Sequence, residues 1–390
     1  MQHSVVIFLT AEGDALPLML QNVMGTPLLS HLASAMAERG TARFFVACRA
    51  AQIDRVKACF AKDADLTIAA EGEVADRLHV FLSSADEDER EVLLLTAPAM
   101  LAPASAAPNF DRAPLPSPAY AVKRLALMDA VDEKFSFNDL LREQGKACTD
   151  RDGWYAVSSA AELADWQPIL AREILSRLAK NGVEIWDYHN CYVEPGVSVG
   201  SGTVLMPGTI LRNGTTIGQN CVIGPNTLID SCKIGNGTVV NASQLTGAVM
   251  GENVNVGPFA YVRPGTVVGD GCKVGDFVEL KNSTLGEGTK VPHLIYVGDS
   301  DVGKRTNFGC GSITCNYDRR EKHRTIIGDD CFIGCNTSLV APVTVASGAY
   351  TAAGSTITDN VPPDALAVAR SRQTNIPDWA RTHKVKEKKK

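Results

Sequence analysis

In this 390-residue chain, two basic residues and one histidine have types and a spacing that suggest chemistry. Arg263 and Lys281 lie 18 residues apart, and two cations held one above the other would form a site for a phosphate monoester. The simpler alternative is that both are solvated surface bases. His293 stands between Pro292 and Leu294. A lone histidine usually has a structural role, but imidazole titrates near neutrality and can act as a general base.

The eleven cysteines do not have the spacing of a metal site. Their number is odd and no Cys-x-x-Cys pair occurs, which predicts free thiols in a reducing compartment. The chain begins without a signal-peptide pattern, and no apolar stretch approaches the length of a membrane span. We therefore expect a cytoplasmic protein with no membrane insertion and no bound metal.

A repeat of six residues determines the secondary structure of the region that must position these side chains. Aliphatic residues recur at this spacing in three series, and 26 of the 33 glycines lie between residues 187 and 360. A period of six fits neither a helix nor an alternating strand, but it fits short strands separated by tight turns. We predict a left-handed parallel β-helix, a triangular prism in which residues 18 apart are stacked. The series are Val193, Val199, Leu205, Leu211, Ile217, Ile223 and Ile229; Val256, Val262, Val268, Val274 and Leu280; and Ile327, Ile333, Leu339, Val345, Thr351 and Ile357.

One step of the repeat is too long. Thirteen residues separate Thr314 from Ile327 where six would continue the pattern. A loop of roughly seven extra residues, within residues 316–324, must therefore protrude from the prism. A protruding loop on a regular solenoid is a candidate binding element.

The region before the prism has a different pattern. Ser159 and Glu162 form a capping-box pattern, and apolar residues then recur at helical spacing up to Asn181-Gly182, which predicts a linker helix over residues 157–183. Strand-like runs at 4–9, 43–47 and 91–96 with a helical run at 27–39 predict an α/β layer structure over residues 1–105. The stretch 102–121, rich in proline and alanine, is typical of a linker.

Charge argues against nucleic acid as a partner. The net charge is -6, and the last ten residues carry six bases and one acid, so the remainder is more acidic still. The basic tail over residues 371–390 is most simply a solvated terminus, and a phosphate-steering role is the alternative.

Residues 263–370 resemble the acetyltransferase half of a bifunctional bacterial family (GlmU), in which glucosamine-1-phosphate N-acetyltransferase is joined to N-acetylglucosamine-1-phosphate uridyltransferase. The similarity extends more weakly through the linker helix. The residues that carry it are YVRPG (261–265), VGDFVELKNS (274–283), HLIYVGD (293–299), GSITCNYD (311–318), TIIGDDCFIG (325–334) and LVAPVTV (339–345).

The resemblance implies a role for each matching position. It implies that His293 is the general base and that Glu279 orients it or raises its basicity. Contacts to the sugar phosphate and the acetyl group would come from Arg263, Lys281, Tyr296, Asn307, Asn316, Tyr317 and Lys322. Acetyl-CoA would be held by Cys335, Ala353 and Arg370. The family has serine where this chain has Cys335, and a thiol donates a weaker hydrogen bond.

The front of the chain departs from the same family. Where the family has a glycine-rich phosphate loop, this chain has Ala11 and Glu12, and Leu18 replaces a lysine. Ala97-Pro98 occupies the position of the family's metal-binding Gly-Asp, and Ser158 or Ser159 occupies that of its metal-binding asparagine. The family's uracil-binding run is missing near residues 71–75. A carboxylate beside a triphosphate repels it, and without cations nothing offsets the charge of the leaving pyrophosphate. We predict that uridyl transfer is lost.

These observations give one organisation and one leading function. Residues 1–105 are predicted as a degenerate, Rossmann-like nucleotidyltransferase domain, 106–156 as a linker and remnant segment, 157–183 as the linker helix, 187–370 as the β-helix acetyltransferase domain and 371–390 as the tail. The expected activity is acetylation of glucosamine-1-phosphate for the cell-wall precursor UDP-N-acetylglucosamine, in a homotrimer with sites between subunits. The alternatives are another amino-sugar phosphate as acceptor, a non-catalytic assembly subunit, and a zinc carbonic anhydrase, for which the chain has too few suitably placed histidines.

Overall fold

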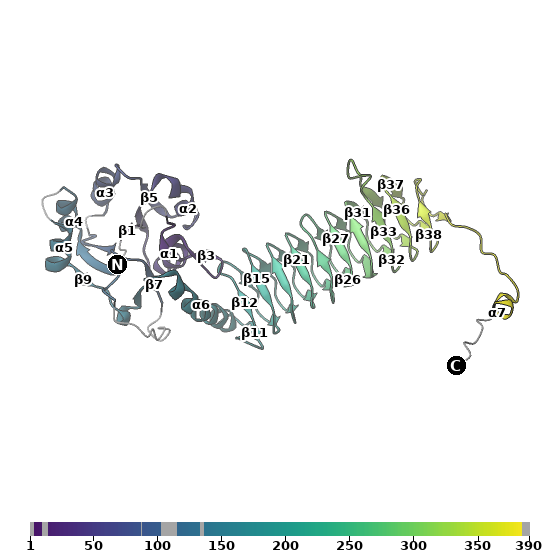
Figure 1. Ribbon diagram of the computed structural model, residues 1–390, viewed down its shortest axis with the longest axis horizontal. Helices are drawn as coiled ribbons and strands as arrows, with labels where there is room; N and C mark the ends of the chain where they lie inside the picture. Colours follow the sequence, from purple (N-terminus) through teal and green to yellow (C-terminus); the bar gives the residue numbers. More distant parts are fainter. Residues whose placement is uncertain (1–3, 10–14, 87, 103–114, 133–135, 384–390) are drawn as a thin grey trace, which may run out of the picture. The chain divides into compact units, whose positions relative to one another are not determined.

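The computed structural model describes residues 4–9, 15–86, 88–102, 115–132 and 136–383, and it divides into two compact units (Figure 1). The first unit comprises Met1–Ser176 and the second Arg177–Lys390. The substituted loop positions Ala11 and Glu12, and the last seven residues of the basic tail, lie outside the described residues.

The first unit is built on a mixed six-stranded sheet in the order β5-β4-β1-β6-β8-β9. The first four strands in this order are parallel, and the last two are antiparallel to their neighbours. The strands are β1 (Ser4–Phe8), β4 (Arg43–Ala47), β5 (Asp65–Ala69), β6 (Glu91–Leu95), β8 (Ala119–Lys123) and β9 (Lys146–Ala147). Buried apolar residues dominate β1 and β4, as expected where helices cover a parallel sheet.

Helices pack on this sheet and complete the core. The core cluster joins Val6 and Phe45 of the sheet to Leu78 of α3, Leu127 of α4 and Leu140 of α5. The elements are α1 (Leu28–Glu38), α2 (Ile53–Lys57), α3 (Val74–Ser83), α4 (Arg124–Val131) and α5 (Phe137–Gln144), with an antiparallel strand pair formed by β7 (Ala99–Leu101) and β10 (Trp154–Ala156) and a short one formed by β2 (Asn22–Val23) and β3 (Thr26–Pro27).

The expectation of a linker and remnant segment over residues 106–156 is corrected for its linker part by this topology. Residues 119–123 form β8, which pairs with β6 along its whole length, and α4, α5, β9 and β10 follow in the same unit. The reason is packing: Ala119 and Val122 are fully buried beside the apolar β6, although the proline-rich residues just before them are typical of a linker. The α/β unit therefore continues past residue 105.

The linker helix forms as predicted. Helix α6 (Ala160–Lys180) begins after Ser159, whose Oγ accepts a hydrogen bond from the backbone N–H of Glu162 at 3.4 Å. The carboxylate of Glu162 reaches back to the backbone N–H and hydroxyl of Ser158 at 2.8 and 2.7 Å. Trp166 is buried and packs on Tyr155, with ring centroids 5.3 Å apart. Among the described residues, no helix is long and apolar enough to cross a membrane.

The second unit is a parallel β-helix of three sheets, of the left-handed type that six-residue repeats give. Short strands run from β11 (Glu184–Ile185) to β40 (Leu366–Ala367), and each pairs with the strand one coil further along the chain (Figure 1). Residues of the predicted aliphatic series, such as Leu211, Val262 and Ile333, are fully buried in the prism. The fold predicted from the period of six is confirmed.

Two of the three sheets carry the candidate site. One contains β26 (Lys273–Asp276), β29 (Lys290–His293), β32 (Asn307–Phe308), β35 (Phe332–Ile333), β38 (Tyr350–Thr351) and β40. The next sheet around the prism contains β24 (Tyr261–Val262), β27 (Glu279–Lys281), β30 (Tyr296–Gly298) and β33 (Ile313–Cys315). The chain passes from the first sheet to the second at one corner of the prism, which we call the catalytic corner; His293, Cys335 and Ala353 lie along it.

Candidate active site

His293 lies at the end of β29, beside a carboxylate on the preceding coil. Asp276 ends β26 and pairs with His293 in the strand register, and His293 Nδ1 is 2.5 Å from Asp276 Oδ1. The hydrogen bond from His293 is the main reason that the pKa of Asp276 lies below its usual value. The His293 side chain is about half exposed, at 53%, so a substrate can reach it.

The expectation that Glu279 orients His293 is corrected. Glu279 pairs in register with Tyr296, three residues beyond the histidine, and its Oε1 accepts a hydrogen bond from Arg263 Nη1 at 2.8 Å. The carboxylate against the imidazole is that of Asp276. Sequence reasoning missed Asp276, although it stands in the VGDFVELKNS run that carried the resemblance.

Three cations gather beside the neighbouring sheet. Arg263 and Lys281 lie on adjacent coils. The backbone N–H of Arg263 donates a hydrogen bond at 2.9 Å to the carbonyl of Leu280, the residue before Lys281. Lys322 comes from the protruding loop, and the nearby Lys281 ammonium lowers the pKa of Lys322, with Arg263 adding to the effect. Such mutual repulsion is relieved when an anion binds between the cations, as expected for a phosphate clamp.

Asp299 holds this cluster together, and sequence reasoning did not select it. It is almost fully buried, with 5% of its surface exposed, and it accepts hydrogen bonds from Lys281 Nζ at 3.1 Å, Asn282 Nδ2 at 2.6 Å and Asn316 Nδ2 at 2.5 Å. Burial alone would raise the pKa of Asp299, but hydrogen bonds from Asn282, Lys281 and Asn316 hold it below its ordinary value. Asn316 also lies 3.4 Å from the hydroxyl of Tyr296.

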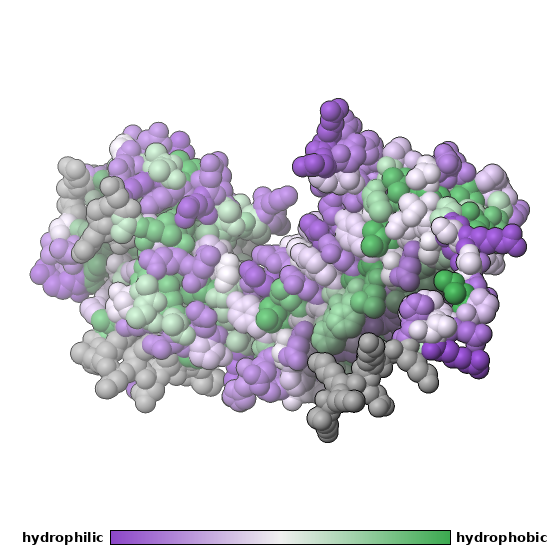
Figure 2. Space-filling model, turned by 45° about the vertical axis from the view of Figure 1, so that its right-hand side comes forward, coloured by the Kyte–Doolittle hydropathy of each residue, from purple (hydrophilic) through white to green (hydrophobic). Residues whose placement is uncertain are grey.

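The protruding loop occupies residues 316–324, as the repeat arithmetic predicts. Tyr317 and Lys322 form an antiparallel bridge, and the backbone N–H of His323 bonds the carbonyl of Asn316 at 2.9 Å. Asp318 accepts backbone N–H bonds from Glu321 and Arg320 and a side-chain bond from His323, and these bonds hold the pKa of Asp318 far below its usual value. Figure 2 shows a group of hydrophilic side chains that projects from the second unit. The loop is thus held by its own hydrogen bonds.

The residues expected to hold the acetyl donor follow His293 along the catalytic corner. The backbone N–H of Gly311 points to the carbonyl of His293, and on the next coils Gly354 N–H bonds the carbonyl of Cys335 at 2.8 Å and Arg370 passes beside Gly354. Ala353 precedes Gly354, and Asn307 lies on β32 one coil beyond His293. With about 4.8 Å between coils, this group extends roughly 20 Å from His293 to Arg370. An elongated donor could lie along it.

Exposed apolar residues line the same corner just before the donor group. Phe259, Phe277 and Leu294 are 61%, 57% and 57% exposed, and the rings of Phe259 and Phe277 stack with centroids 5.5 Å apart. All three have φ between 52° and 60°, a region that bulky residues rarely adopt. Figure 2 also shows hydrophobic patches on the second unit. Exposed apolar groups kept at a backbone cost indicate an interaction surface.

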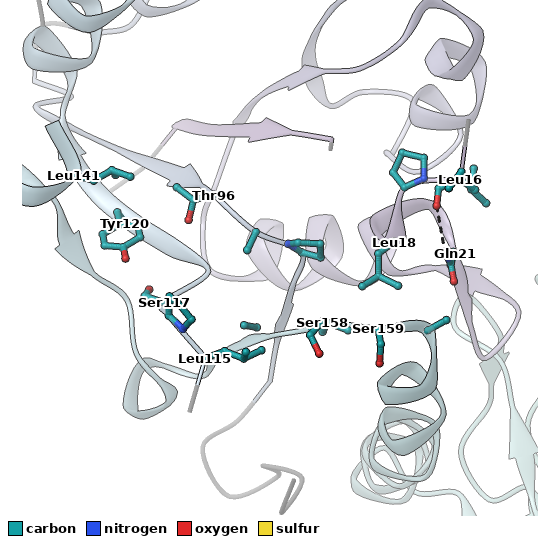
Figure 3. A pocket seen from close by; sticks show the side chains of 18 residues that line it. Leu16, Leu18, Gln21, Thr96, Leu115, Ser117, Tyr120, Leu141, Ser158 and Ser159 are labelled. Carbon is teal, nitrogen blue, oxygen red and sulfur yellow. Dashed lines mark hydrogen bonds between the residues drawn. The ribbon is translucent and has the colours of Figure 1, made fainter. Parts of the chain in front are cut away.

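A separate pocket of about 620 Å³ lies in the first unit (Figure 3). Its lining includes Leu18, Ala97, Pro98, Ser158 and Ser159, the described positions at which the sequence departs from the nucleotide-binding pattern. Thr96, Ser117 and Tyr120 are among its lining residues (Figure 3), and no charged side chain is among the described lining residues. These residues offer no cation for a triphosphate and no carboxylate for a metal.

Comparison with known proteins first identifies the class. A family described as bacterial transferase hexapeptide (six repeats) matches residues 196–231, 247–282 and 324–359, all within the second unit. The C-terminal part of the chain matches bifunctional protein GlmU. The Clostridium perfringens SM101 protein is 50% identical over 245 residues, which are 63% of this chain and 54% of the relative. The protein of Desulfitobacterium hafniense DCB-2 is 48% identical over 228 residues, 58% of this chain and 50% of the relative.

The chain spans about half the length of the curated relatives it matches. Among solved structures, an Arabidopsis UDP-N-acetylglucosamine acyltransferase is 15% identical and covers 45% of this chain and 71% of its own. Its TM-score is 0.27, so this likeness carries no argument about the site.

Proposed function

We propose that this protein transfers the acetyl group of acetyl-CoA to the amine of glucosamine-1-phosphate, a step toward UDP-N-acetylglucosamine and the cell wall. The observation that carries the proposal is that a half-exposed histidine paired to a carboxylate lies in the same part of the prism as three cations, Arg263, Lys281 and Lys322, that are close to one another. The 50% identity to a GlmU relative supports the proposal, because the acceptor and the donor are those that the resemblance implies.

In the proposed reaction, Arg263, Lys281 and Lys322 bind the phosphate, and Asn316, Tyr317 and Tyr296 contact the sugar. Cys335, Ala353 and Arg370 hold acetyl-CoA along the catalytic corner, with Asn307 close to the acetyl group. His293 accepts a proton from the substrate ammonium, and the free amine attacks the thioester carbonyl. Collapse of the tetrahedral adduct breaks the carbon–sulfur bond and releases CoA as its thiolate, and the second proton that the nitrogen loses as it becomes an amide protonates this thiolate. Cys335 has no nucleophilic role in this direct transfer.

We further propose that the first unit does not transfer uridylate. The support is its pocket, in which leucine, alanine, proline and serine occupy the described positions that would need cations and metal ligands. Phosphoryl chemistry depends on such charges to stabilise the leaving pyrophosphate. The unit is left with a packing or assembly role.

A paired assay on the purified full chain tests both proposals. We expect CoA release that depends on glucosamine-1-phosphate, and no pyrophosphate release above background from UTP with N-acetylglucosamine-1-phosphate and Mg²⁺. A bifunctional GlmU protein assayed in parallel controls the second reaction. Acetylation of a different amino-sugar phosphate instead would replace the acceptor. CoA binding without turnover on any amine would favour an assembly subunit, and pyrophosphate release would refute the loss of uridyl transfer.

We also propose that three copies associate so that each site lies between subunits, as the resemblance implies. The apolar residues Phe259, Phe277 and Leu294 supply a surface for such contacts, directly beside Asp276 and His293. A neighbour packed there would reach the reacting groups.

Substitution of Phe277 by aspartate tests this assembly. A charge placed between Phe259 and Leu294 should dissociate the oligomer. Acetyl transfer should fall as well, because each site would lose the neighbouring subunit that completes it. Light scattering measures mass and the CoA-release assay measures activity on the same sample. Phe332→Asp, at another exposed aromatic stack of the second unit, is the matched comparison. A wild-type protein that is a monodisperse monomer with full activity would contradict the proposal.

A further inference from the structure

Asp276 and His293 are held side by side by the backbone of two successive coils. They end β26 and β29 at the same register position, and the backbone N–H of Leu294 bonds the carbonyl of Asp276 at 3.0 Å. The residue after each of them turns the corner in the same way, with φ of 56° at Phe277 and 52° at Leu294. The two side chains therefore leave parallel backbones at matching positions.

Gly275 makes this approach possible. A Cβ built on Gly275 would lie 1.8 Å from the carbonyl oxygen of Pro292, which no side chain could tolerate. The two coils are thus in tight contact at the residues immediately before Asp276 and His293. This contact fixes the distance between the carboxylate and the imidazole without help from any longer side chain.

The proton on the imidazole is then determined by its neighbour. In neutral histidine one ring nitrogen donates and the other accepts, and a carboxylate can only accept. With Asp276 Oδ1 2.5 Å from Nδ1, the proton lies on Nδ1 and the lone pair on Nε2. An imidazole with no partner prefers the opposite tautomer, in which Nε2 carries the proton and cannot take another from a substrate.

We propose that Asp276 is a positioning residue, which selects the tautomer of His293 whose Nε2 can accept the proton of the substrate amine. Its chemical consequence rests on the acetyl transfer proposed above. The low pKa of Asp276 agrees with this role, because the carboxylate remains an anionic acceptor. Glu279 cannot take the role, because its carboxylate is bonded to Arg263.

Nitrogen NMR of the full chain labelled with ¹⁵N-histidine tests the assignment independently of turnover. The spectra are recorded in alkaline buffer, where imidazoles are neutral, and His293→Gln identifies the resonance among the seven histidines. We expect wild-type His293 to carry its proton on Nδ1 and Asp276→Ala to move it to Nε2. Asp276→Asn, which keeps a neutral acceptor, should restore part of the Nδ1–H form. Glu279→Gln should leave the tautomer as in the wild type.

Steady-state kinetics supplies the second readout. Asp276→Ala should lower kcat by about tenfold or more and leave the KM of both substrates nearly unchanged, because an orienting group acts on the proton transfer and not on binding. Glu287→Ala is the matched control, since it removes an exposed carboxylate that pairs with Lys304 at 3.3 Å in the same unit. It should leave kcat unchanged.

The outcomes separate this proposal from the proposed function. A wild-type His293 protonated on Nε2, or an unchanged tautomer in Asp276→Ala, would overturn the role of Asp276 whatever the substrate. The wild-type spectrum decides the question even if the variant does not fold. Failure to acetylate glucosamine-1-phosphate, with a tautomer that does depend on Asp276, would instead refute the acceptor and retain the pairing.

Discussion

Replacement of His293 by alanine is expected to lower kcat for acetyl transfer by at least about 10²-fold. The substrate amine is protonated near neutral pH, and only the free amine can attack the thioester. The imidazole is the group at the catalytic corner that is both half exposed and paired to a carboxylate, so its removal leaves proton transfer to water. Single-turnover measurement of CoA release reports the chemical step directly.

His189→Ala is the control for this experiment. His189 is exposed in the same unit, its backbone N–H bonds Asp187, and it lies far along the chain from Asp276 and His293. It should behave like the wild type. A rate close to that of the wild type in His293→Ala would remove His293 from the mechanism.

Replacement of Lys281 by methionine is expected to reduce kcat/KM for the sugar phosphate by about 10- to 100-fold, the range that one hydrogen bond to a charged group gives. Lys281 is the best-anchored cation of the clamp, because Asp299 Oδ2 holds its ammonium at 3.1 Å and its side chain is only 17% exposed. The KM of acetyl-CoA should change little, since Cys335, Ala353 and Arg370 lie along the catalytic corner on later coils.

Initial rates at varied concentrations of each substrate separate these two effects. Lys304→Met is the matched control, because Lys304 is an exposed base of the same unit that pairs with Glu287. The control should keep the wild-type kcat/KM. A loss in Lys281→Met that fell on acetyl-CoA and not on the sugar phosphate would contradict the clamp.

The prism could be predicted because its signal is local. Each hexapeptide contains its own inward-facing residue, and these residues are buried as the spacing requires, except Val199 near the start of the prism, which is partly exposed. The loop at 316–324 followed from the same count, since a single step was too long. The helix α6 was predicted from caps and periodicity that the structure reproduces.

The partners within the site could not be predicted, because they depend on the register between coils. Arg263 and Lys281 are 18 residues apart, but the next coil is one residue shorter, so that Asp276 pairs with His293 and Glu279 with Tyr296 at a spacing of 17. A constant period of 18 would place Gly275 under His293. A count of residues that assumes a constant period does not reveal the shorter coil, and this coil determines which carboxylate lies beside the imidazole.

The predicted extent of the first unit, residues 1–105, was too short for a different reason. Composition between residues 102 and 121 is typical of a linker, yet β8 adds to the sheet through backbone bonds that composition does not reveal. Long-range strand pairing of this kind has no local signal.

Pairing of each coil only with the coils before and after it has a consequence for tolerance to change. Such an array behaves as a one-dimensional chain of units, in which a disturbance weakens with each interface it must cross. The proposed chemistry uses only the coils from Arg263 to Arg370. The earlier coils, from Glu184 to about residue 250, can therefore vary in sequence, and even in number, while the reacting geometry stays insulated from them.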